Sequence, residues 1–426
     1  MTIRPFCALR PKPLHAEAVA ALPYDVMNTE EARLMAADNP YSFLHVDKAE
    51  IDLPADTDPY SPVVYAKAKE NLQSLADNGV FMQDEKPQLY IYQLEANGGV
   101  QTGLAACVSV AEYEQGIIKR HEFTRPDKEK DRIEHILACC AHTGPIFMAY
   151  RDPSGLKSPK TLMAKWMSSH SPSYDFTADD GVRHTLWVID DETVAQELIQ
   201  AFEAVPYIYI ADGHHRNEAA RKAALIKSAK SANPSNSAEG PLKIGESGNP
   251  DESQFYLAVI FPHDELTIMD YNRVVTDLNG MDVSSFMLAL KEVCKVEESP
   301  VPVKPDCKHV VGMYIKGQWY RLSFQSQKNA DVIDSLDVSV LQNKILSPVL
   351  GIKDPKTDKR IDFVGGIRGL SELEKRVDSG EMAVAFSMYP TSMDELMDVA
   401  DANQIMPPKS TWFEPKLRSG LLVHVF

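Results

Sequence analysis

The sequence of 426 residues predicts a mixed α/β protein, with an α/β domain in the first half joined to a second, α+β domain. Segments with the period of a strand alternate with segments of helical period as far as residue 225, which is typical of a mixed α/β fold. A stretch rich in Ser, Asn, Gly and Pro then follows at 228–253, as in a surface loop or linker. We therefore expect an α/β domain at 1–230, a linker at 231–253 and an α+β domain at 254–426.

The elements of the first domain follow from periodicity and turn residues. Apolar residues at helical spacing predict helices at 30–37, 61–79, 127–141, 160–169 and 192–204. Runs rich in aromatic and β-branched residues predict strands at 89–94, 102–110, 145–150, 185–189 and 206–210. The Asn-Gly-Gly sequence at 97–99 joins the first two of these strands as a hairpin.

The second domain is predicted on the same grounds. A continuous apolar run predicts a buried strand at 254–261, and shorter runs predict strands at 310–315, 318–324 and 382–388. The Lys-Gly turn at 316–317 makes a hairpin of two of them, and an amphipathic helix is expected at 338–350.

Composition restricts the function. A formal net charge of −17 argues against a nucleic-acid partner, although it leaves room for a local basic cleft. The six cysteines form no C-x-x-C, as expected in a reducing compartment. The first residues lack the unbroken apolar run of a secretory signal, and no window approaches 18 apolar residues. We expect a cytoplasmic protein without membrane spans.

The junction between the strand at 206–210 and the helix that follows it carries the densest chemistry of the chain. Asp212, Gly213, His214, His215 and Arg216 stand at this point. The first N–H groups of a helix lack partners and carry partial positive charge, so the junction favours anions. Glycine allows close approach of a ligand, and arginine makes forked contacts with phosphate. The alternative is a helix cap with surface histidines.

A second concentration of polar residues precedes and enters the helix at 127–141. His121 and Glu122 come first, and Lys128, Arg132 and His135 then fall on one helical face. Such a face can bind a ligand. It can equally be a solvent-exposed surface of ion pairs.

Two polar turns near the start and one stiff loop near the end complete the candidates. The turns at 22–28 and 39–45 carry polar residues that either line a pocket or hydrogen-bond within the turns: Asp25, Asn28, Ser42 and His45. The proline-rich loop at 406–416 presents Lys409 and Thr411. It lacks the glycine-rich turn of a Walker A motif, so it is not a P-loop.

Taken together, these motifs resemble a prokaryotic family known as domain of unknown function 1015. The resemblance covers nearly the whole chain and rests on the following motifs: His-Glu-x-Thr at 121–124, Lys-Glu-x-Asp-Arg at 128–132, Ile-Ala-Asp-Gly-His-His-Arg at 210–216, Pro-Pro-Lys-Ser-Thr-x-Phe-Glu-Pro-Lys at 407–416, the Asn-Pro-x-Ser-Phe-Leu-His turn at 39–45 and the helix start at 337–341. Gln342 departs from the histidine of many relatives, so no role is assigned to it.

The Asp-Gly-His-His-Arg motif is also similar to the ParB and sulfiredoxin-like fold, including the archaeal free serine kinases. This resemblance implies a ParB-like nucleotide-binding core in the first half. Sulfiredoxins carry a reactive cysteine where this chain has His214, so their sulfur chemistry is excluded. ParB relatives bind nucleotide phosphates at the turn, and the serine kinases place it beside the transferred phosphoryl group.

These resemblances predict a kinase that transfers a phosphoryl group from ATP or ADP, with Mg²⁺, to the hydroxyl of a free amino acid, most simply L-serine. Phosphate binding is assigned to residues of the junction and the other basic clusters: Gly213, His214, Arg216, Lys128, Arg132, His121, Lys409 and Thr411. Glu122 is the expected general base, because Asp212 at a helix N-terminus near Arg216 should stay ionised. Asp212 would orient a histidine or help to hold Mg²⁺, and His215 is the third expected catalytic residue.

Two other functions remain open from the sequence. A nucleotide-binding regulator without turnover would use the same junction as a switch. A metal-dependent phosphohydrolase is less favoured, since His214 and His215 point about 100° apart on a helix and no zinc-binding motif is present, so no metal ligands are assigned. A homodimer is compatible with the sequence.

Overall fold

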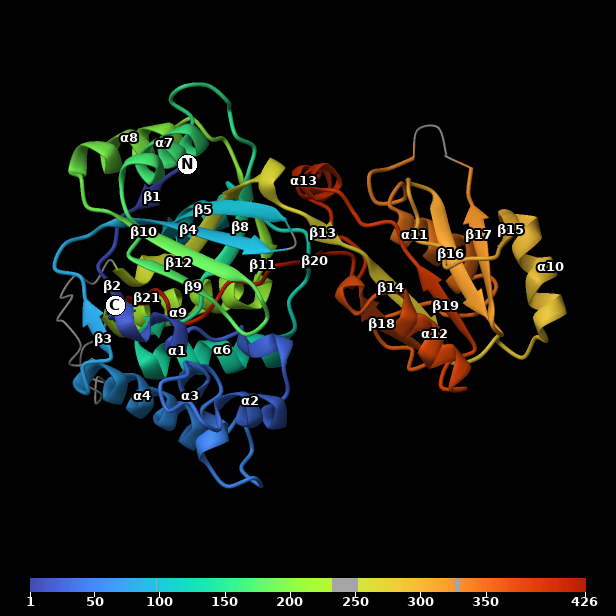
Figure 1. The fold of residues 1–426 in the computed structure, drawn as a ribbon, viewed down its shortest axis with the longest axis horizontal. Coiled ribbons are helices and arrows are strands. Elements are labelled where there is room, and N and C mark those ends of the chain that lie inside the picture. The colour runs from blue at the N-terminus through green and yellow to red at the C-terminus, as the bar shows by residue number, and fades with distance from the viewer. Residues whose placement is uncertain (97, 232–251, 326–329) are drawn as a thin grey trace. The chain divides into compact units, whose positions relative to one another are not determined.

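The computed structural model describes residues 1–96, 98–231, 252–325 and 330–426. They divide into two compact units (Figure 1). Unit 1 comprises Met1–Lys119, Phe123–Leu266 and Pro415–Phe426, and unit 2 comprises Arg120–Glu122 and Thr267–Glu414. Most of the expected linker, at 232–251, lies outside the described residues, and so does Asn97 of the expected hairpin turn.

Among the described residues, a nine-stranded sheet forms the centre of unit 1, in the order β6-β11-β8-β12-β5-β4-β10-β9, with β1 paired to β5. Their bounds are β1 (Ile3–Arg4), β4 (Leu89–Ala96), β5 (Gly99–Ser109), β6 (Ile118–Lys119), β8 (Ile146–Tyr150), β9 (Tyr174–Thr177), β10 (Arg183–Ile189), β11 (Ile208–Asp212) and β12 (Phe255–Pro262). β12 lies between β5 and β8 and is almost entirely buried. A strand that is buried on both faces lies inside a sheet, and β12 is part of the sheet of unit 1. The boundary between the two units therefore follows β12, at Leu266, whereas the sequence placed it before residue 254.

Helices and a smaller sheet surround the central sheet of unit 1. Alternate residues of β8 share one apolar core with Phe202 and Ala219 of two covering helices. The helices of the unit are α1 (Ala16–Val19), α2 (Thr29–Ala36), α3 (Leu44–Asp47), α4 (Pro62–Asp77), α5 (Val110–Glu114), α6 (Pro126–Cys139), α7 (Pro159–Ser169), α8 (Glu192–Glu203) and α9 (His214–Ser231). A second sheet has the order β3-β2-β21-β7, from β3 (Phe81–Gln83), β2 (Ala8–Pro11), β21 (Val423–Val425) and β7 (Ala141–His142).

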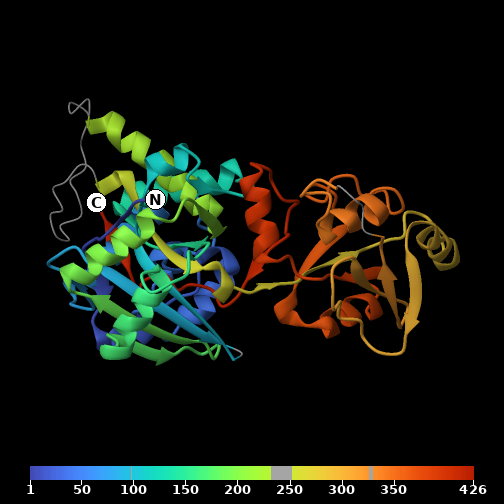
Figure 2. The same ribbon diagram turned by 90° about the horizontal axis from the view of Figure 1, so that it is seen from above.

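The described part of unit 2 is built on a six-stranded antiparallel sheet of order β15-β17-β16-β19-β14-β18. Its strands are β14 (Tyr271–Val275), β15 (Lys295–Ser299), β16 (Val310–Ile315), β17 (Gln318–Ser323), β18 (Ile361–Gly365) and β19 (Val384–Ser387), and β13 (Ile268–Met269) pairs separately with β20 (Trp412–Phe413). The helices are α10 (Val283–Val293), α11 (Asp337–Leu341), α12 (Leu370–Asp378) and α13 (Met393–Asp401). Figure 1 and Figure 2 both show α10 beside the edge strand β15.

The predicted mixed α/β class is confirmed, and the largest local departure falls at the helix expected over 338–350. α11 ends at Leu341, and the next turn, Gln342–Leu346, is a π-helix in which Ser347 N donates to Gln342 O. The side chain of Gln342 donates to Ile352 O at 2.8 Å, beyond the end of the helix. The amphipathic pattern is compatible with both kinds of turn, so it could not predict the change.

Candidate functional site

Strand β11 runs into helix α9 through a single glycine. β11 ends at Asp212, α9 begins at His214, and Gly213 between them has a φ of +92°. Side chains are strained in this region of backbone space, and a Cβ atom at Gly213 would lie 3.1 Å from Arg216 Nε. The predicted junction is confirmed, and glycine is required there both for the turn and for the close approach of a guanidinium.

The Arg216 guanidinium folds back over the first turn of α9. Its Nη1 donates to Pro145 O, whereas no described residue accepts a hydrogen bond from its buried Nε. Helical hydrogen bonding begins with Asn217 N, which donates to Gly213 O at 2.9 Å, so the N–H groups before it lack helical partners. An anion held between Gly213 and Arg216 would satisfy donors of both kinds. The arrangement fits a phosphate group.

Asp212 is held by a residue from the far end of the chain. Lys416 Nζ lies 3.1 Å from Asp212 Oδ2, and Gly213 N donates to Asp212 Oδ1 at 2.9 Å. Burial acts to raise the pKa of Asp212, but Lys416 and Arg216 outweigh it and lower that pKa below its ordinary value. The carboxylate is therefore ionised and weakly basic, as the sequence led us to expect. Lys416 stood in a recognised motif, but we assigned it no role.

The two histidines of the junction differ in their surroundings. His214 is 5 % exposed, whereas His215 is partly exposed. Nε2 of His215 accepts a hydrogen bond from Arg125 N, at the start of α6, at 3.1 Å. Burial lowers the pKa of His215, against the opposing effect of Asp25 and Glu129. His215 is thus a neutral side chain that links α9 to α6, and its expected catalytic role remains a prediction.

Tyr24 connects Arg216 with the charged helix α6. The Arg132 guanidinium lies over the Tyr24 ring, with Cζ 3.9 Å from the ring centroid. Burial raises the pKa of Tyr24, and both Arg132 and Arg216 oppose that rise, so both guanidinium groups lie near the phenol. Burial also opposes the charge of Arg216, but Asp25 and Asp212 help to raise its pKa above the ordinary value. Arg132 and Arg216, both predicted to bind phosphate, therefore lie near the same tyrosine, Tyr24.

The charged face of α6 is buried, so its interpretation as a solvent-exposed surface is wrong. Asp131, Arg132 and His135 are each 8 % exposed or less. Arg132 Nε donates to Asp131 Oδ2 at 2.9 Å, and His135 Nε2 donates to Val46 O at 3.0 Å. Lys128, at the start of the helix, is more exposed, and its Nζ donates to the Tyr60 hydroxyl at 3.1 Å. Local periodicity does not reveal this burial, because α4 and Val46 of α3 lie against the face.

A cavity of about 290 Å³ lies beside this face of α6. Asp25 and Asn28 line it, as one interpretation of the early turns predicted, and Asn28 also caps α2. Ser42 and His45 instead hydrogen-bond within their turn, which was the other interpretation. Ser42 Oγ accepts a hydrogen bond from Leu44 N, and His45 Nε2 donates to Asn39 O at 3.2 Å, both within the turn at 39–45.

Four predicted site residues belong to unit 2: His121, Glu122, Lys409 and Thr411. Met406 N donates to His121 O at 2.9 Å, so the segment with His121 and Glu122 adjoins the proline-rich loop. Buried Arg273 fixes that loop by donating to Lys409 O at 3.0 Å, and burial lowers the pKa of Arg273 to about 10. The stiffness expected of the loop thus has a physical basis, and the functional roles of these four residues remain predictions.

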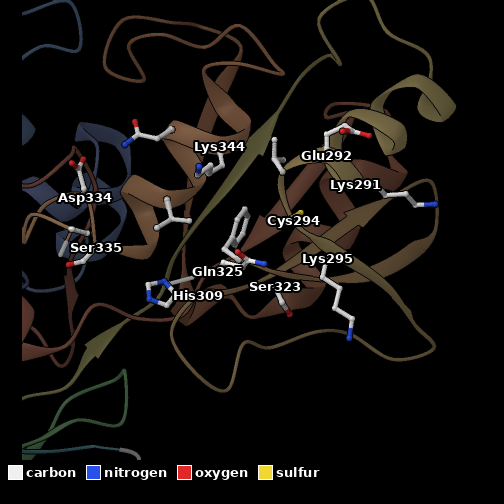
Figure 3. A pocket seen from close by; sticks show the side chains of 15 residues that line it. Lys291, Glu292, Cys294, Lys295, His309, Ser323, Gln325, Asp334, Ser335 and Lys344 are labelled. Carbon is white, nitrogen blue, oxygen red and sulfur yellow. The ribbon is translucent and has the colours of Figure 1, made fainter. Parts of the chain in front are cut away.

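Figure 3 shows a second cavity, of about 660 Å³, in unit 2. Its ammonium groups do not converge, since Lys291 and Lys295 point away from the side occupied by Lys344. None of the predicted site residues lines it. Gln325 and Ala330 both line it, and residues 326–329 between them are outside the described residues.

Two further observations concern metals and membranes. Within the described ranges, no group of three or more His, Cys, Asp or Glu side chains is arranged to hold a metal ion. No helix in the same ranges has both the length and the hydropathy of a bilayer span.

Comparison with known proteins gives one family match. The model of a family described as "Protein of unknown function (DUF1015)" matches residues 3–339. No curated protein matches the sequence.

Several solved structures are distantly similar. A free serine kinase in complex with AMP has 13 % identity and a TM-score of 0.35, over 74 % of this chain and 92 % of its own. A conserved hypothetical protein from Pyrococcus furiosus has 13 % identity and a TM-score of 0.34, over 75 % of this chain and 95 % of its own. C-terminally truncated SbnI from Staphylococcus aureus has 11 % identity and a TM-score of 0.35, over 75 % of this chain and 87 % of its own.

Proposed function

This chain belongs to the DUF1015 family of proteins of unknown function, and from its site we propose a small-molecule kinase. The kinase would transfer a phosphoryl group from ATP or ADP to the hydroxyl of a free amino acid, with L-serine as the expected acceptor. The choice of a free amino acid follows the resemblance of the Asp212–Arg216 motif to free serine kinases. One observation carries the proposal. The buried Nε of Arg216 has no acceptor among the described residues, and it faces Gly213 at the N-terminus of α9.

Phosphoryl transfer makes demands that this junction meets. The reaction needs positioned donors for the phosphate oxygens and little covalent chemistry from the protein. Gly213 gives a phosphate access to the helix N-terminus, and Arg216 supplies the guanidinium donors. Lys416 keeps Asp212 ionised beside them, so Asp212 is a structural and electrostatic partner of this site and a poor general base.

The reaction balances as follows. The acceptor hydroxyl oxygen forms a bond to the terminal phosphorus of ATP or ADP, and the bond from that phosphorus to the bridging oxygen breaks. The bond's electron pair leaves with ADP or AMP, and the hydroxyl proton passes to a carboxylate. We assign that proton to Glu122 as a proposal. Mg²⁺ would be carried mainly by the phosphates, because Mg²⁺ commonly keeps several waters and takes only one or two protein carboxylates.

The experiment that tests the function is phosphorus NMR on the full chain with ATP or ADP, Mg²⁺ and free amino acids. A phosphorylated amino acid that forms in step with ADP or AMP supports a kinase. Tight nucleotide binding without product would support a regulator in its place.

A further inference from the structure

The small cavity beside α6 is lined by charges of both signs. The residues that matter are Tyr24, Asp25, Asp47, Tyr60, Lys128 and Arg132. Three of them make no ion pair with a described residue. Lys128 bonds only to the Tyr60 hydroxyl, Asp47 accepts one bond from Thr143 Oγ1 at 2.7 Å, and the Asp25 carboxylate accepts none. Asp47 is buried and Lys128 is half-buried, whereas Asp25 is exposed to solvent. A buried carboxylate and a half-buried ammonium group that form no ion pair beside one cavity indicate a charged ligand.

The positive and negative groups come from different elements. Lys128 and Arg132 are one turn apart on α6, whereas Asp47 ends α3 and Asp25 lies in the early turn. Arg132 is held by Asp131 through Nε and Nη2, each 2.9 Å from the same carboxylate oxygen, and it rests on the Tyr24 ring. Its Nη1 makes no hydrogen bond with a described residue and can still donate. The cavity is thus lined by donors from α6 and by carboxylates from α3 and the early turn.

The size of the cavity limits the ligand. At about 290 Å³ it lies just below the range of roughly 300 to 1,000 Å³ that holds drug-sized molecules. A nucleotide does not fit such a space as a whole, whereas a small zwitterion does. Its charges also match, because an α-amino acid carries one carboxylate and one ammonium group.

The cavity adjoins the Arg216 site. Helix α6, whose Lys128 and Arg132 line the cavity, packs against α9, which carries Arg216 in its first turn. Asp25, Asp47 and Tyr24 also line the cavity, and all three influence the pKa of Arg216. A ligand in the cavity would therefore sit next to a phosphate held at the junction.

We propose that this cavity is the acceptor subsite and that it selects a small α-amino acid by its two charged groups. Lys128 and Arg132 bind the carboxylate, and Asp25 and Asp47 bind the ammonium group. This inference rests on the proposed function for the transfer step, but the binding can be measured without nucleotide. It also moves Lys128 and Arg132 from the phosphates, where the sequence placed them, to the acceptor.

Isothermal titration calorimetry of the full chain with L-serine, without nucleotide, tests the subsite. The matched probes are L-alanine, which keeps both charges and lacks the hydroxyl, N-acetyl-L-serine, which lacks the ammonium charge, and L-serinamide, which lacks the carboxylate. We expect L-serine and L-alanine to bind, and the two blocked compounds to bind roughly 10- to 100-fold more weakly, the effect of losing a hydrogen bond to a charged group.

Variants then locate the site. Asp25→Asn and Lys128→Gln should each weaken L-serine binding roughly 10- to 100-fold, because each removes one unpaired charge of the cavity. Glu30→Gln is the control, since Glu30 is exposed in the same segment and does not line the cavity. Circular dichroism and the urea midpoint confirm that each variant is folded.

The outcomes separate this inference from the proposed function. Amino-acid binding that depends on Asp25 and Lys128 supports the subsite even if no phosphoryl group is transferred. Phosphorylation of an amino acid whose binding is unchanged in both variants overturns the subsite and leaves the kinase standing. Absence of any binding by L-serine and L-alanine, with or without ADP present, also overturns the subsite.

Discussion

Lys416 Nζ lies 3.1 Å from Asp212 Oδ2, although 204 residues separate the two along the chain. The contact brings the last part of unit 1 onto the β11–α9 junction, and it keeps an ionised carboxylate next to Arg216. The junction is thus held by the end of the chain as well as by its own turn.

Lys416→Met should destabilise the protein by roughly 1 to 3 kcal/mol at pH 7, because it leaves a largely buried carboxylate without its partner. The folded-state pKa of Asp212 lies below the value of about 3.9 for an unfolded chain. The pair therefore stabilises the fold above that pH, and its contribution is lost as the pH falls towards the folded-state pKa. Urea unfolding from pH 7 to pH 3 should show a constant difference between the variant and the wild type above about pH 4 and a narrowing difference below it. Lys86→Met, at an exposed lysine, is the control, and an equal loss at every pH would contradict the assignment.

Gly213→Ala should cost stability and weaken ADP binding together. The backbone at Gly213 has a φ of +92°, and the new Cβ would meet Arg216 Nε at 3.1 Å. Gly116→Ala is the matched control, because Gly116 has a φ of +75° with open space where a Cβ would lie. We expect both variants to lose roughly 1 to 2 kcal/mol from backbone strain. Only Gly213→Ala should weaken ADP binding in calorimetry, and equal affinities in the two variants would count against the phosphate site.

Arg216→Ala should lower turnover roughly 10²- to 10³-fold, the scale of one lost donor to a transition-state oxyanion. Arg221→Ala, on the same helix, removes a guanidinium that pairs with Glu218 and Glu114, outside the proposed site. Its turnover should stay near that of the wild type. The assay is initial-rate release of ADP or AMP with L-serine, on protein shown to be folded. Near-normal turnover in Arg216→Ala would remove Arg216 from the site.

Glu122→Gln should lower turnover roughly 10²- to 10⁴-fold if Glu122 is the general base. Nucleotide affinity should be retained, because the substitution keeps the size of the side chain and removes only its ability to take a proton. A variant with unchanged turnover, or with lost nucleotide affinity, would refute the assignment of the base.

The parts of the site that depend on neighbouring residues could be predicted from the sequence. The alternation before Asp212 and the alanines after His214 predict strand and helix, and Gly213 between them predicts the close turn. The early polar turns likewise contained Asp25 and Asn28, two residues that line the cavity. These features are set by local backbone chemistry, which the sequence displays directly.

The features of the fold and the site that the sequence did not predict depend on long-range packing. The burial of Asp131 and Arg132 depends on Tyr65 of α4 and on Tyr24, far from α6 in sequence, so helical period alone favours a solvent-exposed surface. Asp47 gave no signal, since a single aspartate after an apolar run is common on protein surfaces. Strand β12 belongs to unit 1 because it pairs with β5 and β8, and strand pairing cannot be read from the apolar run itself.

Phosphorus NMR of the full chain with ATP or ADP, Mg²⁺ and L-serine tests the central claim most directly. The account predicts a phosphomonoester resonance of phosphoserine that grows as ADP or AMP accumulates, and that is strongly reduced in Arg216→Ala but not in Arg221→Ala. Unchanged nucleotide in the presence of L-serine and a mixture of the other free amino acids, from a folded protein that binds ADP, would contradict it. That result would identify the Asp212–Arg216 junction as a site that holds a phosphate without transferring it.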